Sequence, residues 1–114
     1  MIKNSSNKKV LTKNKTMCNT IVSQSKGLMF SKEKKDFGLI FNFKKERTIS
    51  LHMFFVFYPI DVISLDAQKK VIDVKENFKP FTTYLAKKKA KYIIELPKGT
   101  IKRTSTKTGD IIEF

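Results

Sequence analysis

Two apolar segments joined by a short polar turn are the feature that most restricts how this chain can fold. Ile60–Leu65 and Lys70–Phe78 are rich in β-branched residues, and the four residues between them read Asp-Ala-Gln-Lys. Apolar side chains occupy both even and odd positions on either side of the turn, so neither segment has a purely polar face. Because a strand with two apolar faces is covered on both sides, the pattern predicts a central hairpin in a β-sandwich or β-barrel.

Further short strands are expected along the chain, each ended by glycine, proline or charged residues. They are predicted at residues 17–22, 38–43, 48–51, 90–96 and 111–114, with brief helical turns at 25–29 and 100–106. Pro59 interrupts the longest apolar stretch, and a proline cannot donate a hydrogen bond within a sheet, so one long strand is excluded there. The predicted fold class is mainly β: a small single-domain β-barrel or sandwich with one or two short helical turns.

The length of 114 residues fits one domain. Residues 1–16 carry five lysines and no acid, with three apolar residues after Met1, and are predicted to form a flexible basic tail on a β domain of residues 17–114. The tail has no secretory apolar core, and no apolar run approaches the ~20 residues that a membrane helix needs. We therefore expect a cytoplasmic protein without a membrane partner.

The formal net charge of +14 suggests affinity for polyanions, because basic proteins displace counterions from phosphates. The alternative is a compositional bias, since only Arg47 and Arg103 among the 24 basic residues are arginine, the side chain best suited to bidentate phosphate contacts. The polyanion hypothesis places non-specific nucleic-acid binding on the tail, on residues 87–91 and on residues 98–107. Its candidate contacts within the middle segment are Lys87, Lys88, Lys89 and Lys91.

The residue types and their spacing do not support a zinc site or a phosphate-binding loop. One cysteine (Cys18) and one histidine (His52) make no recognisable zinc pattern, and the four glycines do not cluster into a phosphate-binding loop. No metal, cofactor or catalytic residue is therefore predicted, and a non-enzymatic role is favoured over catalysis. A hydrolase or transferase with His52 as general base and Asp61 as its orienting carboxylate remains a lesser hypothesis.

The candidate ligand-binding residues are His52, Met53 and Asp61. Asp61 stands between Ile60 and Val62, an unfavourable place for a charge unless it is hydrogen-bonded. Either Asp61 and His52 are polar groups of a small pocket, or Asp61 accepts hydrogen bonds from backbone amides near Pro59 and His52 packs beside Met53. The first interpretation predicts a binding module for a small polar ligand or carbohydrate, and the polyanion hypothesis is the alternative function.

Several short motifs, taken together in their order, resemble the prokaryotic family known as domain of unknown function 192. The motifs lie at residues 27–30, 38–43, 52–62, 65–66, 91–99 and 109–110, so the resemblance covers about residues 17–114. The pair His52-Met53 is similar to the archaeal branch, since many bacterial members have Trp-Met there. The resemblance implies a small β-barrel or sandwich and no established enzymatic activity. It implies neither a ligand nor an oligomeric state.

Overall fold

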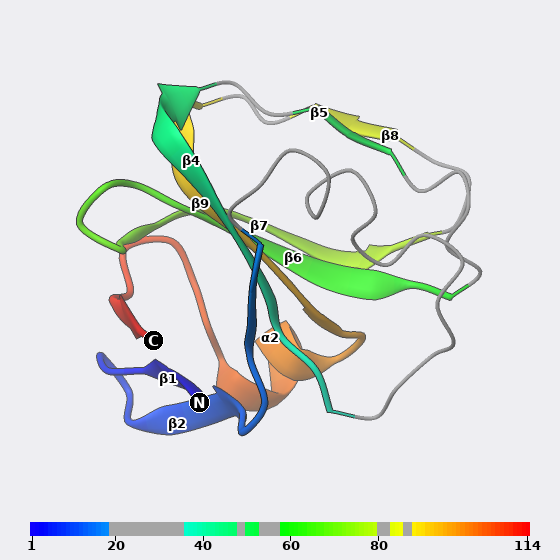
Figure 1. Ribbon diagram of the computed structural model, residues 1–114. Helices are drawn as coiled ribbons and strands as arrows, with labels where there is room; N and C mark the ends of the chain where they lie inside the picture. Colours follow the sequence, from blue (N-terminus) through cyan, green and yellow to red (C-terminus); the bar gives the residue numbers. More distant parts are fainter. Residues whose placement is uncertain (19–35, 48–49, 53–57, 80–82, 86–87) are drawn as a thin grey trace.

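The computed structural model describes residues 1–18, 36–47, 50–52, 58–79, 83–85 and 88–114, and these residues form a mainly β structure (Figure 1). The strands are β1 (Ile2–Asn4), β2 (Lys9–Thr12), β3 (Thr16–Cys18), β4 (Leu39–Arg47), β5 (Ser50–His52), β6 (Ile60–Leu65), β7 (Val71–Phe78), β8 (Thr83–Leu85), β9 (Ala90–Pro97) and β10 (Ile112–Glu113), and the described helix is α2 (Thr100–Thr104). The predicted fold class is thus confirmed. Within the described ranges the sheets do not close into a barrel, and no helix there is long and apolar enough to cross a membrane.

A five-stranded sheet with the order β3-β4-β9-β6-β7 forms the centre of the molecule. All neighbours in it are antiparallel except β3 and β4. The predicted hairpin is present as β6 and β7, and its turn is held by the Asp66 carboxylate, which accepts hydrogen bonds from the amides of Gln68 (2.9 Å) and Lys70 (3.0 Å). The hairpin is not central, however. All of β6 is buried, whereas β7 is the edge strand and exposes residues 75–77.

Residues 2–12 differ from the flexible tail that the sequence predicts for residues 1–16. They form β1 and β2, which join β10 in a three-stranded sheet with the order β10-β1-β2. Ile2 and Leu11 are buried in the core while Lys8, Lys9 and Lys13 stay exposed. The expectation is therefore wrong for these residues, because two buried aliphatic side chains and pairing with the C-terminal strand anchor a hairpin that the lysine content conceals.

A buried polar network connects this N-terminal hairpin to the end of the chain. The Asn4 side-chain amide donates hydrogen bonds to Asp110 Oδ2 (2.8 Å) and Thr106 Oγ1 (3.2 Å), and the Thr106 hydroxyl lies 2.7 Å from that of Thr104. The side-chain Oδ1 of Asn4 accepts hydrogen bonds from the backbone amides of Ser6 and Asn7 in the following turn. Because its partners are fully provided, Asn4 can be completely buried without an unpaired polar atom.

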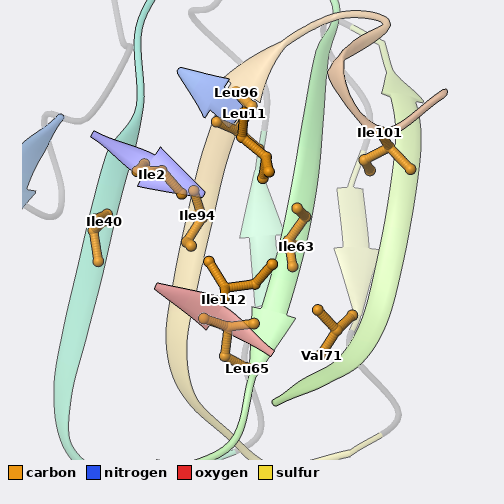
Figure 2. Close-up of a cluster of buried hydrophobic side chains, with 10 residues drawn as sticks. All are labelled: Ile2, Leu11, Ile40, Ile63, Leu65, Val71, Ile94, Leu96, Ile101 and Ile112. Atoms are coloured by element: carbon orange, nitrogen blue, oxygen red, sulfur yellow. The ribbon is translucent and has the colours of Figure 1, made fainter. Parts of the chain in front are cut away.

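Side chains of the five-stranded sheet alternate between two hydrophobic clusters. One face packs against the three-stranded sheet and α2, and this cluster is shown in Figure 2: Ile2, Leu11, Ile40, Ile63, Leu65, Val71, Ile94, Leu96, Ile101 and Ile112. The other face carries a more aromatic cluster: Phe37, Phe41, Tyr58, Ile60, Val62, Phe78, Ala90 and Ile93. Strands β6 and β9 contribute to both clusters, which explains why their sequences are apolar on both sides.

Candidate functional site

Asp61 is almost completely buried and points to the α2 side of the sheet. Its Oδ1 accepts a hydrogen bond from the amide of Asn77 (3.0 Å), and its Oδ2 accepts one from the amide of Ile101 (2.8 Å). Asn77 has a left-handed backbone (φ 51°), and α2 starts after Gly99, which has no side chain to cap it. Asp61 therefore joins β6, β7 and the first turn of α2, as an acceptor for backbone amides that belong to β7 and α2 and are distant from Pro59 in the sequence.

The other predicted ligand contacts are not brought to Asp61 by any described contact. His52 ends β5, and its backbone pairs with Thr83 of β8. The His52 side chain and the whole of Met53 lie outside the described residues. In Figure 1 the β5–β8 pair lies above β6 and β7, and α2 lies below them. The pocket formed by His52 and Asp61 therefore stays a prediction.

A second carboxyl group, Glu95, lies on the opposite face of the same sheet. Glu95 belongs to β9, and its register partners are Leu39 of β4 on one side and Val62 of β6 on the other. Along β9, Ile93 points to the same face as Glu95. Val62 and Ile93 are buried members of the aromatic cluster, and Leu39 packs against it. We call these four residues, Leu39, Val62, Ile93 and Glu95, the Glu95 face.

The electrostatics of Glu95 differ from those of an ordinary surface carboxylate. The side chain keeps partial solvent exposure, but burial raises the pKa of its carboxyl group from 4.5 to about 7. Among the described residues, none donates a hydrogen bond to this carboxyl group or forms an ion pair with it. A carboxyl group whose pKa is strongly raised in an apolar setting is a candidate functional group.

Glu95 is not among the residues predicted from the sequence, although its neighbours carry a signal. Ile94 and Leu96 flank it just as Ile60 and Val62 flank Asp61, so the same argument about an isolated charge applies to both. In the aromatic segment before Pro59, Tyr58 is buried, and its ring meets the ring of Phe37 edge-on with 6.4 Å between the centroids. The other aromatic residues of that segment, at positions 54, 55 and 57, lie outside the described ranges.

The lysines predicted to bind polyanions precede or begin β9. Lys88 and Lys89 are exposed, and Lys87 lies outside the described residues. Lys91 is partly buried, and its Nζ donates hydrogen bonds to Asn42 Oδ1 (2.8 Å) and to the carbonyl oxygen of Phe43. Lys91 therefore has an internal role in connecting β9 with β4.

A shallow groove lies between β2 and α2. It has a volume of about 350 Å³ and is lined by Val10, Leu11, Thr12, Lys13, Asp36 and Arg103. Both oxygens of Asp36 are engaged, one with the Thr12 hydroxyl and the other with the Asn14 side-chain amide (3.0 Å). On the described part of the chain, no group of three His, Cys, Asp or Glu residues is placed to hold a metal ion.

Comparison with known proteins defines the family. Residues 2–114 match the model of domain of unknown function 192 (DUF192), described as "Uncharacterized ACR". The chain belongs to the DUF192 family. The match begins at residue 2 rather than at 17, in agreement with the participation of β1 and β2 in the DUF192 fold.

Relatives support the same assignment, and solved structures share the fold. The chain is 35% identical to a UPF0127 protein of the archaeon Thermococcus sibiricus over all of this chain and 74% of that protein, and 36% identical to the UPF0127 protein of Pyrococcus horikoshii over 86% and 84%. A crystal structure from Sinorhizobium meliloti is 24% identical and has a TM-score of 0.81 over 87% of this chain and 79% of the other. One from Novosphingobium aromaticivorans, of a protein of unknown function, has a TM-score of 0.80 at 25% identity over 88% and 74%. The family and its archaeal type are thus as the resemblance implied.

Proposed function

We propose that this DUF192 protein is a non-enzymatic binding module for a small polar ligand that carries hydroxyl groups, such as a carbohydrate, and that Glu95 is the hydrogen-bonding group of its site. One observation carries the proposal: a carboxyl group is held on an apolar sheet face without a hydrogen-bond donor from the described residues. A desolvated carboxyl group gains free energy from a ligand that supplies the missing partner. Small-ligand sites typically combine apolar walls with a few placed polar groups.

The hydroxyl groups of a ligand can hydrogen-bond to Glu95 whether its carboxyl group is protonated or ionised. With a pKa of about 7, the carboxyl group is largely neutral in mildly acidic solution and can then both donate and accept a hydrogen bond. A sugar hydroxyl group also donates and accepts, so the two groups are complementary in either protonation state. A cationic amine would instead require the ionised carboxylate, and its binding would strengthen as the pH rises through 7.

Binding is favoured over catalysis because of what surrounds the carboxyl group. The described neighbours of Glu95 in the sheet are Leu39, Val62 and Ile93, and none of them can transfer a proton or act as a nucleophile. General acid–base catalysis needs groups of matched pKa within hydrogen-bonding reach of the reacting atoms. His52 and Met53 remain predicted contacts of the same ligand, and a cytoplasmic location remains an expectation.

A thermal-shift screen against sugars, polyols and amines, run at pH 6 and pH 8, tests the proposal. A ligand that binds only the folded state raises the melting temperature with concentration. We expect at least one hydroxylated compound to stabilise the wild-type protein, and Glu95→Ala to remove that shift. Glu113→Ala is the matched control, because Glu113 is an exposed glutamate on β10 and the control should keep the shift.

Two results would overturn the proposal. The first is the absence of any stabilising compound for the folded wild-type protein. The second is a compound that stabilises the wild-type and Glu95→Ala proteins equally, because Glu95 would then not contact it. Stabilisation by amines alone, stronger at pH 8, would replace the hydroxylated ligand with a cationic one.

A further inference from the structure

Two lysine-rich segments that are far apart in the sequence lie side by side in the fold. Residues 8–13 and 98–107 contain seven exposed basic residues and no acidic residue. Helix α2 contacts β2, and Figure 1 shows the two elements next to each other below the five-stranded sheet. We call the resulting surface the basic flank, which consists of Lys8, Lys9, Lys13, Lys98, Lys102, Arg103 and Lys107.

Hydrogen bonds fix the two segments in this arrangement. The Arg103 guanidinium donates to the carbonyl oxygens of Val10 (3.2 Å) and Leu11 (2.8 Å), and the Asn7 side-chain amide donates to the carbonyl oxygen of Thr104 (2.7 Å). Ile101 and Leu11 belong to the same buried cluster, so the packing beneath the surface is continuous. The basic flank is therefore built by the fold rather than by a chance overlap of mobile side chains.

Among the described residues, Asp36 and Asp110 are acidic residues in contact with the basic flank, and both already have partners. Asp36 accepts hydrogen bonds from Thr12 and Asn14 in the groove between β2 and α2. Asp110 is buried and accepts hydrogen bonds from the Asn4 side chain and the Lys107 amide. Seven cations against these two engaged carboxylates leave the surface strongly positive, which attracts an anionic partner.

We infer that the basic flank binds the phosphate backbone of double-stranded nucleic acid without reading its sequence. Lysines act as point charges toward phosphate, and the single arginine of the flank is already committed to two backbone carbonyl groups. Single-stranded nucleic acid is usually held by stacking of its bases on aromatic side chains, and neither residues 8–13 nor residues 98–107 include one. The regular phosphate rows of a duplex require neither stacking nor base contacts.

This binding surface is separate from the site around Glu95. Glu95 points to the aromatic face of the sheet, whereas β2 and α2 cover the opposite face. It is also separate from Lys88 and Lys89, which precede β9, while α2 follows the other end of that strand. Eight residues of extended chain span about 25 Å, so the two lysine groups lie at opposite ends of β9.

The separation gives a matched pair of variants with the same change of net charge. Lys13→Gln with Lys102→Gln removes two charges from the basic flank, and Lys88→Gln with Lys89→Gln removes two charges from the far end of β9. Both sets are exposed and avoid Arg103, so both proteins should fold, as circular dichroism and thermal melting can verify. Binding is measured by fluorescence anisotropy with two unrelated 20-base-pair DNA duplexes and a 20-nucleotide single strand, from 20 to 300 mM salt.

We expect the wild-type protein to bind both duplexes equally, with an affinity that falls steeply as salt rises. The flank variant should bind more weakly, and its log–log salt slope should be smaller by about two, one for each lysine removed. The variant of Lys88 and Lys89 should keep the wild-type slope.

Three outcomes would overturn the inference. The absence of detectable binding at 20 mM salt would show that the protein does not bind nucleic acid. An equal loss of DNA affinity in the two variants would show that the net charge of the protein, and not the basic flank, governs binding. Tighter binding of the single strand than of either duplex would contradict a surface that reads the duplex backbone. Failure of any of these tests leaves the Glu95 proposal unaffected, because the latter is judged by stabilisation with small compounds and by the Glu95→Ala variant, not by nucleic-acid binding.

Discussion

Asp61 and Glu95 are two carboxyl groups in equivalent sequence contexts on the same sheet, yet their surroundings differ completely. Each follows an isoleucine and precedes an aliphatic residue, and each belongs to an interior strand with neighbours on both sides. Asp61 is the more deeply buried, but two backbone amides donate to it. Glu95 has apolar neighbours and a pKa raised to about 7 by burial. The comparison shows that two carboxyl groups with the same kind of sequence neighbours differ in whether the fold supplies them with backbone donors.

The donors of Asp61 come from two special backbone positions. The amide of Asn77 is turned inward where β7 adopts a left-handed conformation, and the amide of Ile101 is one of the unpaired groups at the start of a helix. On the aromatic face of the sheet, Leu39 and Val62 sit in regular strands beside Glu95. Their backbone amides lie in the plane of the sheet, where they cannot reach a side chain that stands away from it.

The largest effect should follow removal of the Asp61 carboxylate. Asp61→Ala leaves the buried amide of Ile101 and the partly buried amide of Asn77 without acceptors, and a buried group of this kind costs about 1–3 kcal/mol. We expect the free energy of unfolding, measured by urea denaturation, to fall by about 3 kcal/mol or more. Asp66→Ala is the control, because Asp66 also accepts two backbone amides but lies in a turn that water can reach. Equal losses in the two variants would contradict the structural role of Asp61.

Removal of the Glu95 charge should raise the free energy of unfolding, and the size of this effect should depend on pH. A carboxyl group whose pKa is raised in the folded state stabilises the fold fully below the unfolded pKa, and this contribution is lost as the pH rises to the folded pKa. The wild-type protein should therefore lose stability between pH 4.5 and about 7 on account of Glu95.

Glu95→Gln cannot ionise and should lose this part of the pH dependence. At pH 8 it should be more stable than the wild-type protein by about 1–2 kcal/mol, less than a fully buried group would give because Glu95 keeps partial exposure. Urea denaturation at pH 4, 6 and 8 measures both effects. A variant that is less stable than the wild-type protein at pH 8 would show that the carboxylate already has a donor.

The parts of the fold that the sequence could predict are those with local signals. The bounds of β6 match the predicted Ile60–Leu65, because apolar runs, Pro59 and the Asp66 turn mark both ends within a few residues. The helical turn after Gly99 was predicted for the same reason. The N-terminal hairpin could not be predicted in this way. It is held by pairing with β10 and by the hydrogen bond from Asn4 to Asp110, whose residues are 106 positions apart.

The site is harder to predict than the fold, because the groups that contact its carboxyl groups are distant from them in the sequence. Local sequence identifies Asp61 and Glu95 as carboxyl groups in apolar strands, and it identifies nothing more. Which of them finds donors depends on amides 16 and 40 residues away from Asp61. The sequence therefore predicts that such groups exist, and only the arrangement of β7 and α2 gives Asp61 the two backbone donors that Glu95 does not receive from the described residues.

A donor placed beside Glu95 should make its surroundings resemble those of Asp61, and this is the smallest effect that we predict. Leu39 stands directly opposite Glu95 in the register of β4 and β9, where facing side chains are close enough to touch. In Leu39→Asn, the new amide group can donate to the carboxylate and favour its charged form, so the pKa of Glu95 should fall by about one unit. A carbon-detected NMR titration of the Glu95 side chain measures this value. Leu39→Met adds no donor and should leave the pKa at about 7. The same pKa in both variants would mean that a donor is not what Glu95 lacks.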